Sequence, residues 1–294
     1  MPNLKDLKIR IESVKSTRKI TKAMQMVAAA KLRKAQEAAE EARPYAKRMA
    51  RVLNKLTTSV SDISTGSPLL IGNGKNEKFL IIVATSERGL CGAFNSSIVR
   101  LAKSHISDLL SDDKRVDILT IGKKGREQLK REFGDSMTDH VDLSTIKKMT
   151  YEEASIISES ILEKFSRKEF DVAMIFYNQF ESVISQIPKV QQLIPVEKKN
   201  EADSDNEIVE LSYAYEPDEQ EIIEDLLPKA IATKVFTALL ENGASEQGAR
   251  MSAMDNATRN AGEMIDKLTI QFNRSRQAAI TNELIEIISG AEAL

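Results

Sequence analysis

The stretch "ASEQGARMSAMDNATRNAGEMIDKL", residues 244–268, decides the fold. Its apolar and small residues recur at alternating steps of three and four, which is the 3.5-residue period of a coiled-coil seam. The stretch lies inside a longer segment without proline, residues 229–294. A helix over that segment, at about 1.5 Å per residue, would reach roughly 100 Å. The C-terminal part of the chain is therefore predicted to form a rod.

A matching seam begins near the N-terminus and connects Leu4, Leu7, Ile11, Val14, Arg18, Thr21, Gln25, Ala28 and Leu32. Because the two seams lie at opposite ends of the chain, a folded middle domain that returns the chain would pair them antiparallel. Polar residues at core positions, Arg18 and Gln25 here and Asn282 in the second seam, lower stability and serve register or contact with a third partner. Pro44 predicts a kink or a change of direction near residues 42–44.

Between these helices the hydrophobic period changes. Short β-branched runs at 78–86, 115–122 and 170–178 are typical of strands buried in a parallel sheet, and the segments 94–110 and 151–165 between them have helical spacing. This alternation predicts a Rossmann-like α/β domain of doubly wound type with about 4 to 6 strands. Residues 183–196 and 207–216 complete the sheet, with their prolines at edges or strand ends.

The sequence thus predicts an α/β fold combined with a long coiled coil, in three parts. Residues 1–60 form the N-terminal coiled-coil helix, residues 75–216 the central α/β domain, and residues 217–294 the C-terminal coiled-coil helix. The N- and C-terminal helices flank the central domain as an antiparallel pair.

Charge is strongly segregated along the chain, although the net charge is only -2 at pH 7. Residues 1–58 carry 15 Lys/Arg against 5 Asp/Glu, and residues 196–225 carry 2 against 12. The overall balance argues against a nucleic-acid-binding protein, and the basic helix lacks the interleaved aromatic residues that single-strand stacking needs. The basic helix suits an acidic protein surface or an anionic membrane face, and residues 197–207 are predicted to be a solvated loop.

The small numbers of cysteine and histidine residues, and the short apolar runs, exclude several further classes of protein. One cysteine, Cys91, excludes an internal disulfide, and two separate histidines give no metal-ligand spacing. No cofactor or metal is predicted. The longest apolar run, residues 79–84, is far short of the roughly 20 residues that span a bilayer. The first residues show neither a signal core nor an Arg/Ser-rich leader, so we expect neither export nor import.

No glycine-rich loop meets the requirements of a nucleotide site. Residues 72–78 lack the Walker spacing and the Ser/Thr that would hold magnesium. Residues 121–127 follow a strand and open a helix, so their amides offer an anion site, but a tight strand-to-helix turn is the favoured interpretation.

Two further groups of residues suggest chemistry. The loop 85–95 combines Gly89, Cys91 and Gly92 after the first strand, and we interpret it as a tight turn with Cys91 packed as a small apolar residue rather than as a catalytic thiol. Glu283 and Glu286 lie three apart on one helical face, as an acid/base pair would. Because nothing supplies a cleft around them, a pair that faces a partner is the favoured interpretation.

Four stretches together form a pattern shared with a known family: "KSTRKITKAMQMVAAAKLRKA" at 15–35, "TSERGLCGAFN" at 85–95, "AYEPD" at 214–218, and "ASEQGARMSAMDNATRNA" at 244–261 followed by "NRSRQAAITNELIEIISGAEA". Over essentially its whole length the sequence resembles the gamma subunit of the F-type, proton-translocating ATP synthase. The ending Ile-Thr-x-Glu-x-x-Glu followed by Gly-Ala is the most specific of these matches. The family's "LYEPD" is "AYEPD" here.

The resemblance implies a noncatalytic rotor. It implies two terminal helices that form an antiparallel shaft inside a ring of alternating alpha and beta subunits, and an α/β domain on the membrane-embedded c ring beside the epsilon subunit. Proton flow turns the shaft, which drives ATP synthesis in the beta subunits. The expected location is the cytoplasmic side of a bacterial inner membrane, as a peripheral subunit. The chain lacks the cysteine pair of the redox-regulated chloroplast type, and the resemblance gives residues 197–207 no role.

Individual roles follow from motif position in that family. Residues implied to contact the catalytic ring are Met24, Arg250, Arg276, Gln277, Thr281, Glu283 and Glu286. Residues implied to lie at the foot, near the c ring and epsilon, are Tyr215, Glu216 and Asp218.

Two other classes of protein remain open from the residues alone. One is a small α/β enzyme with a coiled-coil dimerisation segment, which would use Cys91 or the turn 121–127 and would bind a nucleotide or substrate by itself. The other is a passive coiled-coil tether, whose seam would tolerate any substitution that preserves the heptads.

Overall fold

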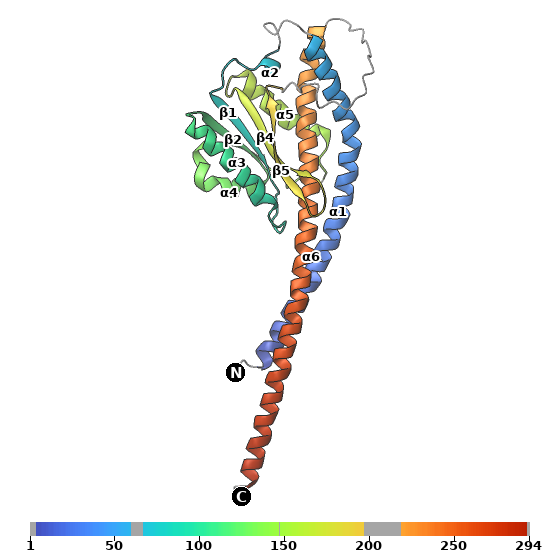
Figure 1. Cartoon of the computed structure of the whole chain (residues 1–294), viewed down its shortest axis with the longest axis vertical. Helices are drawn as coiled ribbons and strands as arrows, with labels where there is room; N and C mark the ends of the chain where they lie inside the picture. The colour runs from blue at the N-terminus through green and yellow to red at the C-terminus, as the bar shows by residue number, and fades with distance from the viewer. Residues whose placement is uncertain (1–3, 60–66, 147, 197–218, 293–294) are drawn as a thin grey trace. The chain divides into compact units, whose positions relative to one another are not determined.

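The computed structural model describes residues 4–59, 67–146, 148–196 and 219–292. The elements follow in the order α1 Leu4–Ser59, α2 Pro68–Ile71, β1 Lys78–Ala84, α3 Phe94–Ser111, β2 Arg115–Ile121, α4 Lys123–Phe133, the 3-10 helix η2 Gly134–Ser136, β3 Met137–Val141, α5 Tyr151–Ser166, β4 Val172–Phe180, β5 Gln186–Ile194 and α6 Glu219–Glu292 (Figure 1). The chain divides into unit 1, residues 1–30 with 250–294, and unit 2, residues 31–249.

Unit 2 contains a five-stranded sheet in the order β3-β2-β1-β4-β5. The strands β3, β2, β1 and β4 are parallel, and β5 is antiparallel to β4. The runs predicted at 78–86, 115–122 and 170–178 form β1, β2 and β4, and the predicted helices form α3 and α5. The strand order reverses between β1 and β4, as it does in the predicted doubly wound class.

Each face of the sheet is covered by its own helices. Successive residues of a strand point to opposite faces, and in β1 Ile81 packs with α3 and α4, whereas Ile82 packs with α5 and α6. Both side chains are completely buried. Burial of an aliphatic side chain of this size stabilises the folded state by about 1.5 to 3 kcal/mol, so the uninterrupted apolar run of β1 accounts for a core on both faces.

The edges of the sheet differ from its centre. The prediction that residues 183–196 add an edge strand is confirmed, because β5 lies at one edge and carries Pro188. The opposite edge strand, β3, was not predicted from the sequence. Its residues "MTDHV" are partly or fully exposed, so it has no apolar run that would indicate a strand. The predicted strand 207–216 lies outside the described residues.

Both long helices contain a proline. α1 continues through Pro44 as one helix, and α6 begins before Pro228 rather than after it. A proline inside a helix removes one backbone hydrogen bond and costs about 3 kcal/mol. Around Pro228, Leu227 and Ile231 are completely buried against the sheet, and this packing offsets the cost.

Unit 1 is the predicted antiparallel helix pair. Leu7 and Ile11 of α1 pack against Leu268 of α6, with Val14 and Phe272 at the margin of this cluster. The hydroxyl of Thr258 donates a hydrogen bond to that of Thr21 at 2.8 Å, and Gln25 Nε2 donates one to Asp255 Oδ1 at 2.8 Å. As the residue number rises in α1 it falls in α6, so the antiparallel pairing is confirmed.

Two seam positions differ from the prediction. Arg18 and Asn282, predicted at core positions, are exposed. The Arg18 side chain is long enough to carry its guanidinium from the seam into solvent. Asn282 lies in a stretch, residues 280–290, in which every residue is exposed. The polar residues Thr21 and Gln25, by contrast, bond across the seam and specify its register.

We predict that Gly122→Ala destabilises the chain by about 3 kcal/mol or more, because φ is +91° at this residue and a Cβ would lie 2.3 Å from the carbonyl oxygen of Thr85. The measurement is urea unfolding of the full chain. The matched control is Gly134→Ala, where φ is -54° and no atom lies within 4 Å of the added Cβ. The control is expected to unfold at the same or a slightly higher urea concentration. Equal stability of the two variants would contradict the prediction.

Candidate functional site

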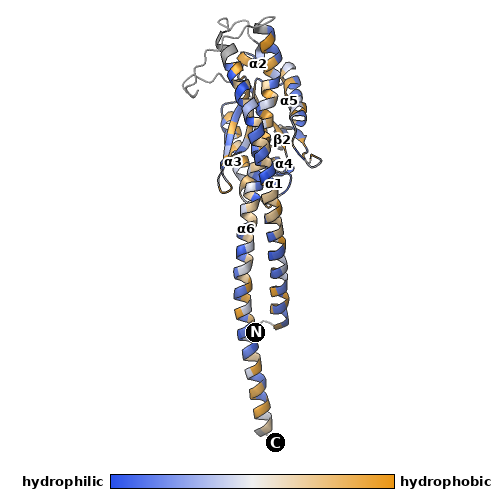
Figure 2. Ribbon diagram, turned by 90° about the vertical axis from the view of Figure 1, so that its right-hand side faces the viewer, coloured by the Kyte–Doolittle hydropathy of each residue, from blue (hydrophilic) through white to orange (hydrophobic). Residues whose placement is uncertain are grey.

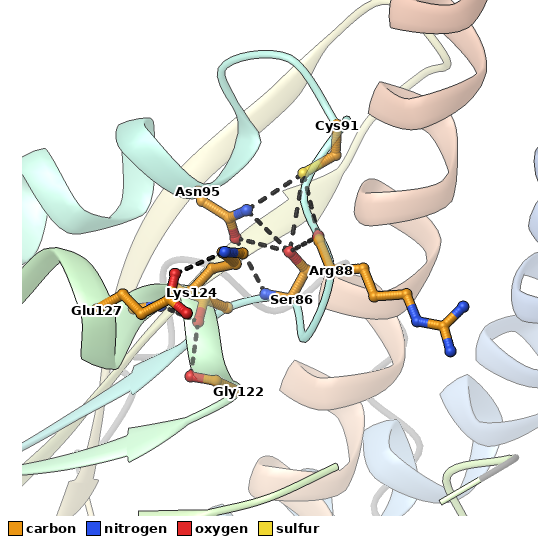
Figure 3. Close-up of polar contacts among 9 residues, drawn as sticks. Ser86, Arg88, Cys91, Asn95, Gly122, Lys124 and Glu127 are labelled. Atoms are coloured by element: carbon orange, nitrogen blue, oxygen red, sulfur yellow. Dashed lines mark hydrogen bonds and ion pairs between the residues drawn. The ribbon is translucent and has the colours of Figure 1, made fainter. Parts of the chain in front are cut away.

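The loop after β1 is held by a small polar network. Asn95 Oδ1 accepts a hydrogen bond from the backbone N–H of Ser86 at 3.0 Å, and Asn95 Nδ2 lies 2.8 Å from Ser86 Oγ and 3.2 Å from Cys91 Sγ (Figure 3). The Ser86 hydroxyl also donates to the carbonyl of Arg88 at 2.6 Å. Ser86, Cys91 and Asn95 are all buried. This network fixes the tight turn that the glycines of the loop predict.

The same loop covers the start of α4. The backbone N–H of Gly125 donates to Thr85 Oγ1 at 2.8 Å, and the N–H of Lys124 donates to the carbonyl of Ser86 at 3.1 Å. The first N–H groups of a helix are free for an anion only when nothing else accepts from them. Two of them are occupied here, so residues 121–127 form a strand-to-helix turn, as favoured above, and not an open anion site.

A third contact fills the end of the sheet between β1 and β4. β1 pairs with β4 as far as Val83 and Phe176. Two residues later, the N–H of Asn178 donates to Asn242 Oδ1 at 3.0 Å, and the carbonyl of Asn178 accepts from Ser245 Oγ at 3.0 Å. We call these three residues the β4–α6 contact. Asn178 and Ser245 are completely buried, and Asn242 is 5% exposed.

These three contacts lie where a doubly wound fold binds its ligand, at the carboxyl ends of the strands beside the point where the strand order reverses. The backbone N–H groups of Lys124, Gly125 and Asn178 at this edge are bonded to the chain itself, whereas Oδ1 of Asn178 is buried without a hydrogen-bond partner among the described residues. The described residues also contain no group of three or more His, Cys, Asp or Glu side chains arranged to hold a metal ion. The arrangement therefore favours a structural use of this edge over catalysis.

The C-terminal end of α6, in unit 1, carries a run of exposed apolar residues. The last turns of α6 contain several hydrophobic residues (Figure 2). Among them, Ile280, Leu284, Ile285, Ile287 and Ile288 are each between 48% and 67% exposed. Contiguous exposed apolar residues of this kind mark an interaction surface. Among the described helices none is long and apolar enough to cross a membrane.

Comparison with known proteins identifies the family. A family model described as ATP synthase matches residues 3–294. The chain is 64% identical over 297 residues to the ATP synthase gamma chain of Jannaschia sp., and 62% identical over 295 residues to that of Paracoccus denitrificans, each match covering 100% of both chains. This chain belongs to the ATP synthase gamma chain family. The resemblance stated from the four sequence stretches is confirmed.

Solved structures agree with the fold. The central stalk and c-ring structure of the Tetrahymena thermophila mitochondrial ATP synthase contains a chain that is 27% identical, with a TM-score of 0.60, over 81% of this chain and 99% of that one. A chain of the Euglena gracilis mitochondrial ATP synthase has a TM-score of 0.69 at 20% identity, over 99% of this chain and 94% of that one. The predicted combination of an α/β sheet with long terminal helices is confirmed.

The predicted contact residues fall into three groups. Arg276, Gln277, Thr281, Glu283 and Glu286 are exposed on the last turns of α6, and Met24 and Arg250 are half-buried in unit 1. Tyr215, Glu216 and Asp218 lie outside the described residues. The roles given to all of them stay predictions.

Sequence reasoning missed the residues of the β4–α6 contact. The available signal is modest: Asn242 and Ser245 are polar residues three apart, which places them on one face of a helix whose neighbours Leu239, Leu240 and Ala244 are buried. Asn178 ends an apolar strand run. Nothing in the sequence indicates that Asn178 contacts this face of the helix.

Glu241, the neighbour of Asn242, is a partly buried acid. Burial raises the pKa of its carboxyl above the usual 4.5, while the charges of Arg43 on α1 and Lys189 on β5 act in the opposite direction. Its Oε2 atom is buried without a hydrogen-bond partner among the described residues. On β4, burial and the charge of Glu241 raise the pKa of Tyr177 to about 12.

We predict that Glu241→Gln stabilises the chain at pH 8 and that this gain shrinks towards pH 4.5. A raised pKa in the folded state means that the stability contributed by the protonated carboxyl is present below the unfolded pKa and is lost as the pH rises through the folded pKa. Urea unfolding across this pH range measures the difference. Glu224→Gln, an exposed position on the same helix, is the control. A pH-independent loss of stability in Glu241→Gln would refute the assignment.

We predict that Cys91 reacts slowly with a thiol reagent in the folded chain, because its side chain is 2% exposed and access requires local opening. Since it is the only cysteine, the colour released by an aromatic disulfide reagent reports it alone. The same chain in 6–8 M urea, roughly the range that unfolds small domains, is the control and is expected to react at the rate of a free thiol. Equal rates in the two conditions would contradict this packing.

Proposed function

We propose that the chain is the central-stalk rotor of a proton-driven ATP synthase. It couples proton flow through a membrane ring to ATP synthesis or hydrolysis in a ring of alpha and beta subunits by rotation. The observation that carries the proposal is full-length identity above 60% to curated ATP synthase gamma chains. The similarity to a chain of the Tetrahymena central stalk and c-ring structure supports the same role. The chain is a subunit of the complex and not its catalytic one.

The proposed partners follow from that role. The α/β part, residues 75–216, contacts the c ring and the epsilon subunit through Tyr215, Glu216 and Asp218. The terminal helices, residues 1–60 and 217–294, form the shaft inside the alpha and beta ring. The chain binds no nucleic acid and is peripheral to the membrane, on the cytoplasmic side of a bacterial inner membrane. Its curated relatives at this identity are alphaproteobacterial proteins, which supports that location.

The surface of the shaft tip suits a rotating contact. From residue 277 to the end the sequence contains no Lys or Arg, while Ile280, Leu284 and Ile287 are exposed. Apolar contact is non-directional, so its energy changes little with rotation, whereas an oriented salt bridge would favour one angle. The exposed Glu283 and Glu286 are two of the three glutamates of this tip, and they meet each partner in turn.

Asymmetry of the shaft is what gives it control over catalysis. A partner shifts a conformational equilibrium only by binding the two conformations with different free energies. The shaft presents a different face to each of three catalytic subunits, so each is biased to a different conformation at any moment. Met24, Arg250, Arg276, Gln277 and Thr281 are the proposed polar and apolar contacts that carry this bias.

The test is coupled ATP synthesis in membrane vesicles that contain the assembled complex. We predict that Arg276→Ala and Gln277→Ala each lower the synthesis rate roughly five- to tenfold, which corresponds to about 1 to 1.4 kcal/mol of lost contact energy. Thr269→Ala is the matched control, because this exposed hydroxyl donates only to Ile265 of its own helix at 2.7 Å.

Deletion of residues 280–294 is the stronger variant. It is expected to abolish coupling, because it removes the exposed apolar turns of α6. Complexes that assemble and synthesise ATP at the normal rate without these residues would overturn the rotor proposal. A passive tether predicts that result, and it also predicts that Arg276→Ala behaves like Thr269→Ala.

A further inference from the structure

The β4–α6 contact forms where two backbone groups of β4 have no partner in a neighbouring strand. Asn178 lies opposite Pro188 of β5, and a proline has no N–H to donate. In an antiparallel pair, alternate residues direct both backbone groups away from the partner strand. The N–H and carbonyl of Asn178 point in this way towards the position that β1 would occupy, but β1 ends at Ala84. Two buried backbone groups therefore need partners from another element.

Helix α6 supplies both partners from one face. Asn242 accepts from the Asn178 N–H, and Ser245, three residues further along, donates to the Asn178 carbonyl. The Asn178 side chain also reaches the opposite helix, because its Nδ2 donates to the carbonyl of Phe94 in α3 at 3.1 Å. One buried residue of the sheet thus joins α3 and α6.

One turn further along, α6 again lies close to β4. A Cβ added at Gly248 would lie 3.2 Å from Cε2 of Phe180, the last residue of β4. Ala244 and Ala249 on either side are buried. The small residues let the helix come near enough for two short side chains, Asn242 and Ser245, to reach the strand backbone.

The hydrogen bonds of the β4–α6 contact restrict the rotation of α6 about its own axis. Apolar attraction between the helix and the sheet is not directional, whereas a hydrogen bond weakens steeply away from its preferred angle, so hydrogen bonds add a constraint on the rotational angle of the helix about its axis. Two hydrogen bonds from positions three residues apart to the two backbone groups of one residue fix that angle. They are shielded from water, where a missing partner leaves a polar group unsatisfied at a cost of about 1 to 3 kcal/mol.

We propose that the β4–α6 contact is the torque-transmitting junction of the rotor. It fixes the rotational angle of α6 on the sheet, five residues before α6 continues into unit 1. Asn178, Asn242 and Ser245 act as positioning residues and touch no nucleotide. The inference rests on the proposed rotor function and adds to it the place where the sheet drives the helix.

The test uses the assembled complex in inverted vesicles. Proton pumping driven by ATP hydrolysis is divided by the hydrolysis rate, which gives a coupling ratio that is independent of how much complex assembles. Ser245→Ala removes one of the two bonds and is expected to lower this ratio. In a single-molecule measurement with the catalytic head immobilised and a probe on the sheet, it is expected to raise the angular variance above that of the wild-type complex, because the buried carbonyl of Asn178 loses its partner.

Matched variants separate this role from general stability. Ser245→Thr keeps the hydroxyl and Asn242→Asp keeps the acceptor oxygen, so both are expected to stay closer to the wild-type angular variance than Ser245→Ala and Asn242→Ala. Thr237→Ala removes a hydroxyl of the same helix that donates only to Thr233 of α6 at 2.9 Å. It is expected to leave both the ratio and the variance unchanged.

The outcomes distinguish the two proposals. A normal ratio and variance in both Ser245→Ala and Asn242→Ala would overturn the junction while leaving the rotor function intact. A variance that rises equally in Thr237→Ala would also overturn it, since the effect would then be one of helix stability. Absence of coupling and rotation in the wild-type complex would instead overturn the rotor function itself.

Discussion

The fold of unit 2 depends on one constraint, which is that β4 is longer than the strand beside it. Beyond Phe176 the inner edge of β4 has lost β1, and the backbone of Asn178 would be buried without partners. A buried backbone N–H or C=O must be paired with something. In most doubly wound proteins this region is open to a ligand and to water. Here Asn242 and Ser245 of α6 take that place, and the helix becomes part of the sheet's hydrogen-bonding scheme.

The need to pair the buried backbone groups of Asn178 accounts for the residue types around the β4–α6 contact. The helix must approach the strand closely, which explains why Ala244, Gly248 and Ala249 surround Ser245. The loop after β1 must also close over the sheet without leaving its own groups unpaired, and Asn95 and Thr85 complete this closure. The edge that could hold a nucleotide is thereby used for packing, which agrees with a subunit whose family leaves catalysis to others.

The sequence was sufficient for features that depend on periodicity or on runs of one residue type. β1 was predictable because six of its seven residues are buried and apolar, and the helix pair because its seam repeats over many turns. β3 was not, since "MTDHV" at an edge has no period to detect. The seam prediction placed Arg18 and Asn282 in the core because spacing alone does not say where the opposite helix ends or which way a long side chain turns.

The candidate functional residues also differ in whether the sequence predicts them. Tip residues such as Gln277 and Glu283 were predicted as contact residues through a family motif, since exposure alone gives a helix surface no role. The β4–α6 contact was invisible in the sequence because it joins residues 64 and 67 positions apart, and a Ser or Asn in a helix is most often solvated or bonded to its own backbone.

The two units use polar groups in opposite ways. In unit 1 the Thr21–Thr258 and Gln25–Asp255 bonds are only partly buried, so they specify register while adding little stability. In unit 2 the bonds of Asn178 are completely buried and so are costly to break. A shaft that must flex slightly as it passes successive partners benefits from the first arrangement, and a helix that must not turn on its sheet benefits from the second. The proposed junction therefore accounts for the difference between the buried polar groups of unit 2 and the part-buried ones of unit 1.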